Sequence, residues 1–196
     1  MVLSSMKAGA EQTVDRRLQR IKEIIIQKGG YKLQGSFTLA SGRVSNLYFN
    51  TKTATLDPEG VSLIAEVVYD RIKDLGVTSI GGLVQGSIPI AVVVAQLSYR
   101  RRPDRPIQAF WVRKEQKEHG DKTTFEGTLT PNSKVIVVDD VATTGGSIDN
   151  AIKGVVAQNC EIERIIVLLD REEGAKERFT KEGYDYECLL RASDFR

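Results

Sequence analysis

Paired acids followed by small hydroxyl and glycine residues occur in the segment KVIVVDDVATTGGSIDNAI, residues 134–152. The apolar run Val135 to Val138 predicts a buried strand, and Asp139 and Asp140 stand where that strand is expected to end. The residues that follow can turn tightly and donate hydrogen bonds, and a helix predicted to begin there adds its positive dipole end. Such a loop suits a phosphate monoester. The acids before it can accept hydrogen bonds from two ribose hydroxyls, directly or through a metal-bound water.

The alternative to a ligand site is a segment that only turns the chain and caps a helix. An isolated acid pair or glycine pair usually only marks a turn or a helix cap, but the whole ordered string favours a ligand. The GxxxxGK[ST] pattern of nucleoside triphosphatases is absent, because the lysine is missing and the acids precede the loop. These differences argue against hydrolysis of a nucleoside triphosphate.

Cations gather in a second segment, WVRKEQKEHGDKTTFEG, residues 111–127. Arg113, Lys114, Lys117 and His119 could close over a polyanion and stabilise the charge of a departing pyrophosphate. Because acids are interleaved with these cations, a solvated surface loop is the alternative, and it is the commoner explanation of mixed charge. A third segment, GGLVQGSIPIA (81–91), places small residues between a predicted strand and helix, which is a weak signal for an anion-binding turn.

Helices and strands that could position these segments are visible in the hydrophobic pattern. Apolar residues at helical spacing predict a helix over residues 11–28, and Asp57 before Pro58 predicts the start of another. Between them, residues 35–53 have broken β-like patterning, as a substrate-covering lobe would. From residue 79 on, apolar runs alternate with helical segments. That order favours a parallel sheet covered by helices, with ligands at the carboxyl ends of its strands.

The composition is that of an ordinary globular protein of one domain. Its 196 residues can bury one core, and 28 basic against 26 acidic residues give +2, so no general affinity for nucleic acid or membranes is expected. Cys160 and Cys188 form no CxxC pair, which disfavours zinc and fits a reducing cytoplasm. No signal peptide or membrane span is predicted, and residues 1–10 are expected to be a loose tail.

Three strings resemble those of a known enzyme family. VIVVDDVATTGGS resembles the 5-phosphoribosyl 1-pyrophosphate (PRPP) signature of the type I phosphoribosyltransferases. RKEQKEHG and FTLASGRVSNLYFNTK resemble the catalytic loop and the N-terminal substrate segment of orotate phosphoribosyltransferases. The resemblance implies an α/β fold with a central parallel sheet flanked by helices and a small N-terminal hood. A single phosphoribosyltransferase domain then covers residues 1–196, with helix and hood over about 11–55 and the α/β core and C-terminal segment over about 56–196.

The resemblance also implies a role for each matching residue. Catalysis is assigned to Lys117, His119, Asp139 and Asp140, with Mg²⁺ held mainly by PRPP and water near the two aspartates. The residues expected to bind PRPP are Arg113, Lys114, Lys117, His119, Gln85, Gly86, Ser87, Asp139, Asp140, Val141, Ala142, Thr143, Thr144, Gly145, Gly146 and Ser147. The residues expected to bind orotate are Ser41, Gly42, Tyr48, Phe49, Thr143 and Arg171.

This sequence departs from the family pattern at two positions. Bacterial relatives carry a lysine in the loop that here contains Gln85, Gly86 and Ser87, and some carry one where this chain has Ala40. A side-chain contact is therefore missing or is supplied differently. The resemblance further implies a homodimer whose catalytic loop reaches into the neighbouring subunit. After YDYECLL (184–190) only a polar tail is expected, so a decarboxylase of orotidine monophosphate would be a separate partner.

Two other functions stay open at this point. The chain could transfer phosphoribose to a purine or to another pyrimidine. It could also be a PRPP sensor that regulates transcription, although that function predicts an added DNA-binding domain and a degraded loop, and the sequence indicates neither. The aromatic residues Phe37 and Phe49 fit a platform for a planar base and a packed hood core about equally well.

Overall fold

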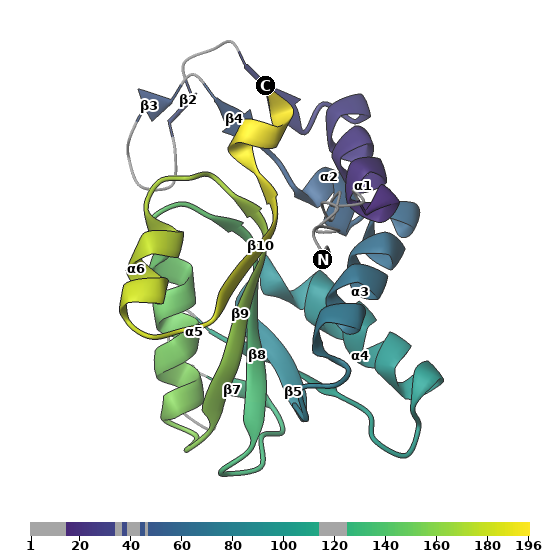
Figure 1. The fold of residues 1–196 in the computed structure, drawn as a ribbon, viewed down its shortest axis with the longest axis vertical. Helices are drawn as coiled ribbons and strands as arrows, with labels where there is room; N and C mark the ends of the chain where they lie inside the picture. The colour runs from purple at the N-terminus through teal and green to yellow at the C-terminus, as the bar shows by residue number, and fades with distance from the viewer. Residues whose placement is uncertain (1–14, 34–36, 39–43, 46, 114–124) are drawn as a thin grey trace, which may run out of the picture.

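The computed structural model describes residues 15–33, 37–38, 44–45, 47–113 and 125–196. Its centre is a six-stranded sheet with the order β10-β9-β8-β5-β6-β7 (Figure 1). Neighbouring strands run parallel except for the edge pair β6 and β7, which is antiparallel. The strands are β5 (Ser79–Leu83), β6 (Gln108–Val112), β7 (Phe125–Gly127), β8 (Lys134–Ala142), β9 (Glu161–Asp170) and β10 (Tyr186–Arg191). The expected α/β class with a parallel core is confirmed.

Helices cover both faces of this sheet (Figure 1). The longer helices α1 (Arg16–Gln27), α3 (Pro58–Ile72) and α4 (Ser87–Arg101) lie on one face, and α5 (Gly146–Val156) and α6 (Ala175–Lys181) lie on the other. Strand β8 shows why both faces are covered. Ile136 and Val138 join the core under α3 and α4, whereas Val135 and Val137 join the core under α5. A continuous apolar run is what a strand buried on both faces requires.

Capping residues fix where the first helices begin. Asp57 precedes α3 as predicted, and its carboxylate accepts a hydrogen bond from the backbone N–H of Gly60 at 2.8 Å. The first helix was predicted over residues 11–28, but α1 begins only at Arg16. Asp15 caps it by accepting from the backbone N–H of Arg17 at 3.0 Å. Residues 11–14 of that prediction lie outside the described part of the chain.

The strands of the hood are very short, and the hood depends on the C-terminus for support. β1 (Tyr31–Lys32) pairs with β4 (Tyr48–Phe49), and β2 (Phe37–Thr38) pairs with β3 (Val44–Ser45). The rings of Tyr31 and Phe49 both contact Phe195, with centroids 5.3 and 5.0 Å away. Phe195 belongs to a 3₁₀ helix, η1 (Ala192–Phe195), so the prediction of a polar tail is wrong for these residues. The tail folds back because its aromatic ring completes an apolar cluster.

None of the described helices combines the length and the apolar character that a membrane span requires.

Replacing Phe195 with Ala is expected to lower the free energy of unfolding by about 3 kcal/mol, because a buried ring in contact with two others is lost. Urea denaturation measures this change. Phe195→Leu, which keeps most of the apolar volume, should lose no more than about 1.5 kcal/mol. Equal stability of the Ala variant and the wild type would show that the C-terminus does not support the hood.

Candidate active site

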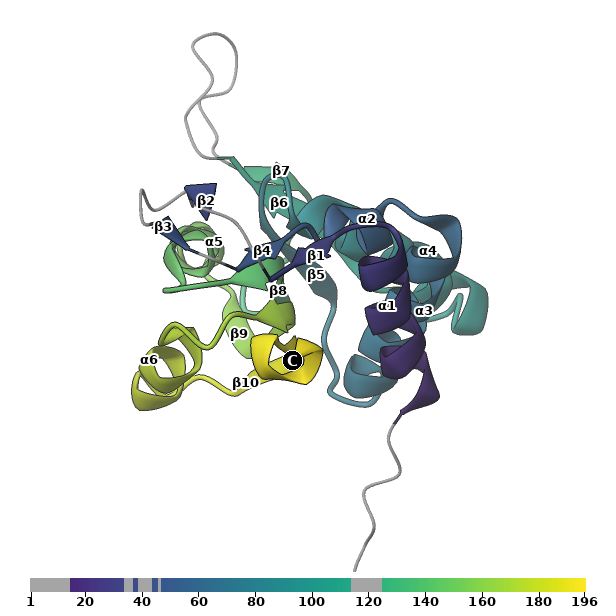
Figure 2. The same cartoon turned by 90° about the horizontal axis from the view of Figure 1, so that it is seen from above.

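The carboxyl ends of the parallel strands form one edge of the sheet, and the hood lies over that edge. Figure 2 looks down on it and shows β1 and β4 above β5 and β8. This is the edge at which parallel α/β sheets bind ligands. Most of the residues with predicted roles that the structure describes come together here from β4, β5, β8, β9 and the loops that follow them.

Asp139 and Asp140 lie side by side near the end of β8, and both are buried. The backbone N–H of Asp140 donates to Oδ1 of Asp139 at 3.0 Å. Asp140 is also held from the hood side, where the hydroxyl of Thr51 donates to its Oδ2 at 2.9 Å. Nζ of Lys52 lies 3.5 Å from the same oxygen. The strand was predicted to end at these acids, but it continues to Ala142 because β9 pairs with it as far as that residue.

Burial changes the acidity of this pair. Removal of the carboxyl group from water, together with the neighbouring charge of Asp140, raises the pKa of Asp139 to about 8. A strongly perturbed carboxyl group in a cleft is typical of functional sites.

The loop after β5 lies directly against the two acids. A Cβ atom on Gly86 would come within 2.1 Å of Oδ1 of Asp140 and 3.0 Å of Oδ1 of Asp139, so only glycine fits there. The preceding Val84–Gln85 peptide bond is cis. Ser87 is fully buried, and its hydroxyl donates to the carbonyl oxygen of Leu83 at 2.9 Å. Of this predicted trio, Gln85 and Gly86 therefore line the cleft, whereas the side chain of Ser87 secures the turn into α4.

The loop between β8 and α5 has the geometry that its sequence predicted. Gly145 precedes α5 in the left-handed conformation, with φ of 89°, and a Cβ atom there would lie 2.4 Å from the ring of Phe179. Thr144, Gly146 and Ser147 are exposed at the helix start, and Thr143 is half-buried. Their position at the positive end of α5 suits an anion. Val141 and Ala142 are not part of this loop but form the last two residues of β8.

Arg171, at the end of β9, joins the core to the hood. Its side chain is buried, Nη2 donates to the carbonyl oxygen of Leu47 at 3.3 Å, and Nε lies 3.0 Å from a carboxylate oxygen of Glu173. The preceding Asp170 is also buried and accepts from the hydroxyl of Tyr186 at 2.8 Å. Burial of the phenol and this carboxylate raise the pKa of Tyr186. Sequence reasoning found Arg171 but missed Asp170, which no motif indicated.

The aromatic residues of β4 have different surroundings. Phe49 packs with Tyr31 and Phe195, which favours its alternative role as part of the hood core. Tyr48 is half-buried, and Nζ of Lys32 lies 5.9 Å from its ring centroid. Ser41 and Gly42 lie outside the described residues, as do Ala40 and, in the loop after β6, Lys114, Lys117 and His119. Arg113 is described, and its guanidinium lies 2.5 Å from a carboxylate oxygen of Glu126 on β7.

Sequence reasoning also missed Thr51 and Lys52, because residues 35–53 were expected to be β-like. The structure instead forms a four-residue helix, α2 (Lys52–Thr55), immediately before α3. This helix borders a cleft of about 290 Å³ between the hood and the loop after β5. The cleft is lined by Lys52, Thr55, Leu56, Gln85, Gly86, Ile88, Pro89 and Asp140.

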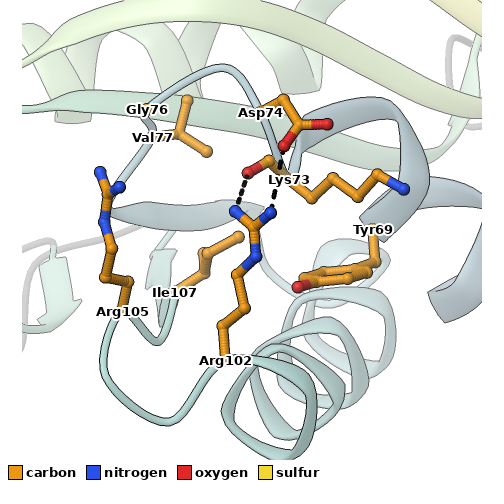
Figure 3. Close-up of a pocket in the computed structure, with 8 residues that line it drawn as sticks. All are labelled: Tyr69, Lys73, Asp74, Gly76, Val77, Arg102, Arg105 and Ile107. Atoms are coloured by element: carbon orange, nitrogen blue, oxygen red, sulfur yellow. Dashed lines mark hydrogen bonds and ion pairs between the residues drawn. The ribbon is translucent and has the colours of Figure 1, made fainter.

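A second cavity, of about 180 Å³, lies at the opposite edge of the sheet (Figure 3). Val77 and Ile107, which line it, precede β5 and β6 at their amino ends. Arg102 also lines it and donates to the carbonyl oxygen of Lys73 at 3.1 Å and to Asp74 at 3.3 Å. Because none of the residues with predicted roles borders this cavity, it does not belong to the same site.

Comparison with known proteins agrees with this fold and site. A family model described as a phosphoribosyl transferase domain matches residues 55–195, so the chain has the fold of a phosphoribosyltransferase and belongs to that class of protein. An orotate phosphoribosyltransferase of Rhodopseudomonas palustris (strain BisB5) is 45% identical over 166 residues, covering 83% of this chain and 88% of that protein. The chain therefore belongs to the orotate phosphoribosyltransferase family.

Solved structures of one relative support the same assignment. The orotate phosphoribosyltransferase of Mycobacterium tuberculosis H37Rv in complex with Fe(III) dicitrate superposes with a TM-score of 0.76. It is 31% identical, and the match covers 91% of this chain and 98% of the other. The same relative in complex with PRPP gives a TM-score of 0.71 at 26% identity, with 94% of each chain covered.

Replacing Gly145 with Ala is expected to lower the free energy of unfolding by about 2 kcal/mol or more. The new Cβ would meet the ring of Phe179, and φ of 89° is strained for alanine. The adjacent Gly146→Ala is the matched control, because a Cβ at Gly146 meets nothing within 4 Å. Urea denaturation of both variants should show a loss for Gly145→Ala alone. A similar loss in both would contradict the strain described for Gly145.

Asp139→Asn is expected to change how stability depends on pH. Because the folded-state pKa of Asp139 lies above its unfolded value, this carboxyl group favours the folded state at low pH. That contribution is lost as the pH rises from about 4 to about 8. The neutral amide does not titrate, so the variant should gain stability relative to the wild type across this window. Urea denaturation at pH values across this window measures the difference. If the free energies of unfolding of the variant and the wild type changed with pH in parallel, the raised pKa would be disproved.

Proposed function

We propose that this chain transfers the 5-phosphoribosyl group of PRPP to orotate, giving orotidine 5′-monophosphate and pyrophosphate, in a Mg²⁺-dependent step of pyrimidine biosynthesis. The observation that carries the proposal is the meeting of the β8 acids, the Gly86 turn and the loop before α5 at one sheet edge. The family match and the relative solved with PRPP support the donor, and the relatives' shared activity supports orotate as the acceptor.

For each part of PRPP, the protein has residues of suitable chemistry. The exposed start of α5, with Thr144, Gly146 and Ser147, presents N–H groups and hydroxyls to the 5′-phosphate. The buried carboxylates of Asp139 and Asp140 can accept hydrogen bonds from the ribose hydroxyls. The Gln85–Gly86 turn lies beside them, where pyrophosphate would be attached to the ribose.

Magnesium fits the residues that are present. Among the described residues no group of three or more His, Cys, Asp or Glu side chains could hold a metal ion by itself. Mg²⁺ commonly keeps several waters and binds through one or two carboxylates and substrate phosphates, so Asp139 and Asp140 would hold it together with PRPP. When bound, the ion would neutralise part of the charge on the pyrophosphate.

The proposed reaction is a displacement at C1 of the ribose with dissociative character. The bond from C1 to the pyrophosphate oxygen breaks, and its electron pair leaves with pyrophosphate. A bond to the orotate nitrogen forms on the opposite face, the proton of that nitrogen is released to solvent, and the configuration at C1 is inverted. Lys117 and His119, with Arg113 and Lys114, stabilise charge on the departing pyrophosphate. Enzyme groups act mainly by positioning the two substrates.

Orotate is proposed to bind between the hood and the ends of β8 and β9. Ser41 and Gly42 would contribute N–H and hydroxyl groups, Tyr48 a ring face, and Thr143 and Arg171 hydrogen-bond donors. The position of Arg171 supports this, because its guanidinium lies where β9 meets the hood. Phe49 would shape the pocket from the hood core rather than contact the base.

The protein is proposed to act as a cytoplasmic homodimer that shares its catalytic loop across the interface. Val92 and Tyr99 are exposed and lie seven residues apart on α4, so they share a helix face that such an interface could cover. Two free thiols support a reducing compartment. A separate orotidine monophosphate decarboxylase would consume the product.

Loss of orotate, followed by its own absorbance, tests the proposed reaction. Purified protein with Mg²⁺ and PRPP should consume orotate. In parallel assays, uracil, adenine, guanine and hypoxanthine should be consumed at least about a hundredfold more slowly. Discrimination on this order is what a polar site achieves against bases that lack the groups it hydrogen-bonds. Omission of PRPP or chelation of the metal should abolish the loss.

The same assay distinguishes the remaining alternatives. Faster consumption of a purine would move the chain to another branch of the phosphoribosyltransferases. Tight PRPP binding without turnover of any base would support a sensor of PRPP.

A further inference from the structure

The cleft beside Gly86 contains one cation among its described lining residues, and this cation comes from the hood. Lys52 extends from the start of α2, with its side chain 54% exposed, and its Nζ lies 3.5 Å from Oδ2 of Asp140. The neighbouring Thr51 donates to the same oxygen at 2.9 Å. The ammonium group therefore stands at the junction between the buried acids and the open cleft.

Among the described lining residues, the opposite wall of the cleft contributes no positive charge. The loop after β5 contributes Gln85 and Gly86, and α4 contributes Ile88 and Pro89, all of them uncharged. Behind Gly86 lie the buried carboxyl groups of Asp139 and Asp140. A pyrophosphate group entering this cleft would meet an electrostatically unfavourable surface unless a cation faced it.

We propose that Lys52 binds the pyrophosphate group of PRPP and thereby supplies from the hood the cation that the Gln85–Gly86–Ser87 loop lacks. This inference rests on the proposed function. In the free protein Lys52 forms an ion pair with Asp140. When PRPP binds, its flexible side chain turns toward the pyrophosphate in the same cleft. Thr51 keeps its hydrogen bond to Asp140, so the acid remains positioned for the ribose.

A purely structural role of Lys52 is the competing explanation, and ligands that share only part of PRPP separate the two. Inorganic pyrophosphate and PRPP both contain the group assigned to Lys52. Ribose 5-phosphate lacks it, but uses the acids and the loop before α5. If Lys52 only holds Asp140 in place, its loss should weaken the binding of ribose 5-phosphate as much as the binding of PRPP.

Lys28 provides a matched control elsewhere on the surface. Its Nζ lies 2.6 Å from Oδ2 of Asp57, with side chains 52% and 10% exposed, against 54% and 12% for Lys52 and Asp140. Both pairs join an exposed lysine to a poorly exposed aspartate. Lys28→Met therefore reproduces the loss of such a pair without touching the cleft.

The experiment is calorimetric titration of the full chain with each ligand in the presence of Mg²⁺. Lys52→Met should lower the affinity for PRPP and for inorganic pyrophosphate by roughly 10- to 100-fold, the usual effect of losing a charge-assisted hydrogen bond. Ribose 5-phosphate should change less than about threefold, since its contacts remain. Lys52→Arg should restore most of the affinity, and Lys28→Met should bind all three ligands as the wild type does.

Several outcomes would overturn the inference. Unchanged PRPP affinity in Lys52→Met would remove Lys52 from the donor site while leaving the proposed function intact. Equal weakening of ribose 5-phosphate would reduce Lys52 to a structural partner of Asp140. If the wild type neither binds PRPP nor consumes orotate, the proposed function fails as well. Unfolding midpoints for Lys52→Met and Lys28→Met confirm that both variants are folded during titration.

Discussion

Two carboxyl groups buried side by side constrain the sheet edge at the carboxyl ends of the strands and the hood above it. Taking Asp139 and Asp140 out of water is costly unless donors are brought to them. The chain meets this requirement from far away in sequence, because Thr51 and Lys52 reach Asp140 from the hood. On the other side, the acids leave no space for a side chain at Gly86. The hood, the turn after β5 and the end of β8 are thus positioned by the same pair.

The hood could not hold its place by its own hydrogen bonds. Its strands are two residues long, which is too short for independent stability. Other segments support it: Phe195 packs against Tyr31 and Phe49, and Arg171 donates to the carbonyl of Leu47. The substrate-facing edge is therefore formed by the first helices, the middle of the sheet and the last residues together. A change at the C-terminus can reach the site without touching any ligand.

Much of the core could be predicted from local signals, because burial on both faces and helix capping leave traces in sequence. The apolar run before Asp139 predicted β8, and Asp57 predicted the start of α3. Failures occurred where distant contacts decide the outcome. β8 continues past its acids because β9 pairs with it as far as Ala142, and Phe195 folds back because its ring packs in an apolar cluster. The helix that places Lys52 is only four residues long, too short for a periodic signal.

The hydrogen-bond donors around Asp139 and Asp140 affect the acidity of the pair and the ligands that it can bind. Within the described residues, the two carboxyl groups receive one hydroxyl, one backbone N–H and one half-exposed ammonium group. Burial, together with the charge of the neighbouring Asp140, raises the pKa of Asp139. In the proposed complex, the ribose hydroxyls of PRPP would bring further hydrogen-bond donors to these oxygens and so stabilise the buried pair. A buried acid pair of this kind costs the fold some stability, and in the proposed function it is retained because it binds PRPP.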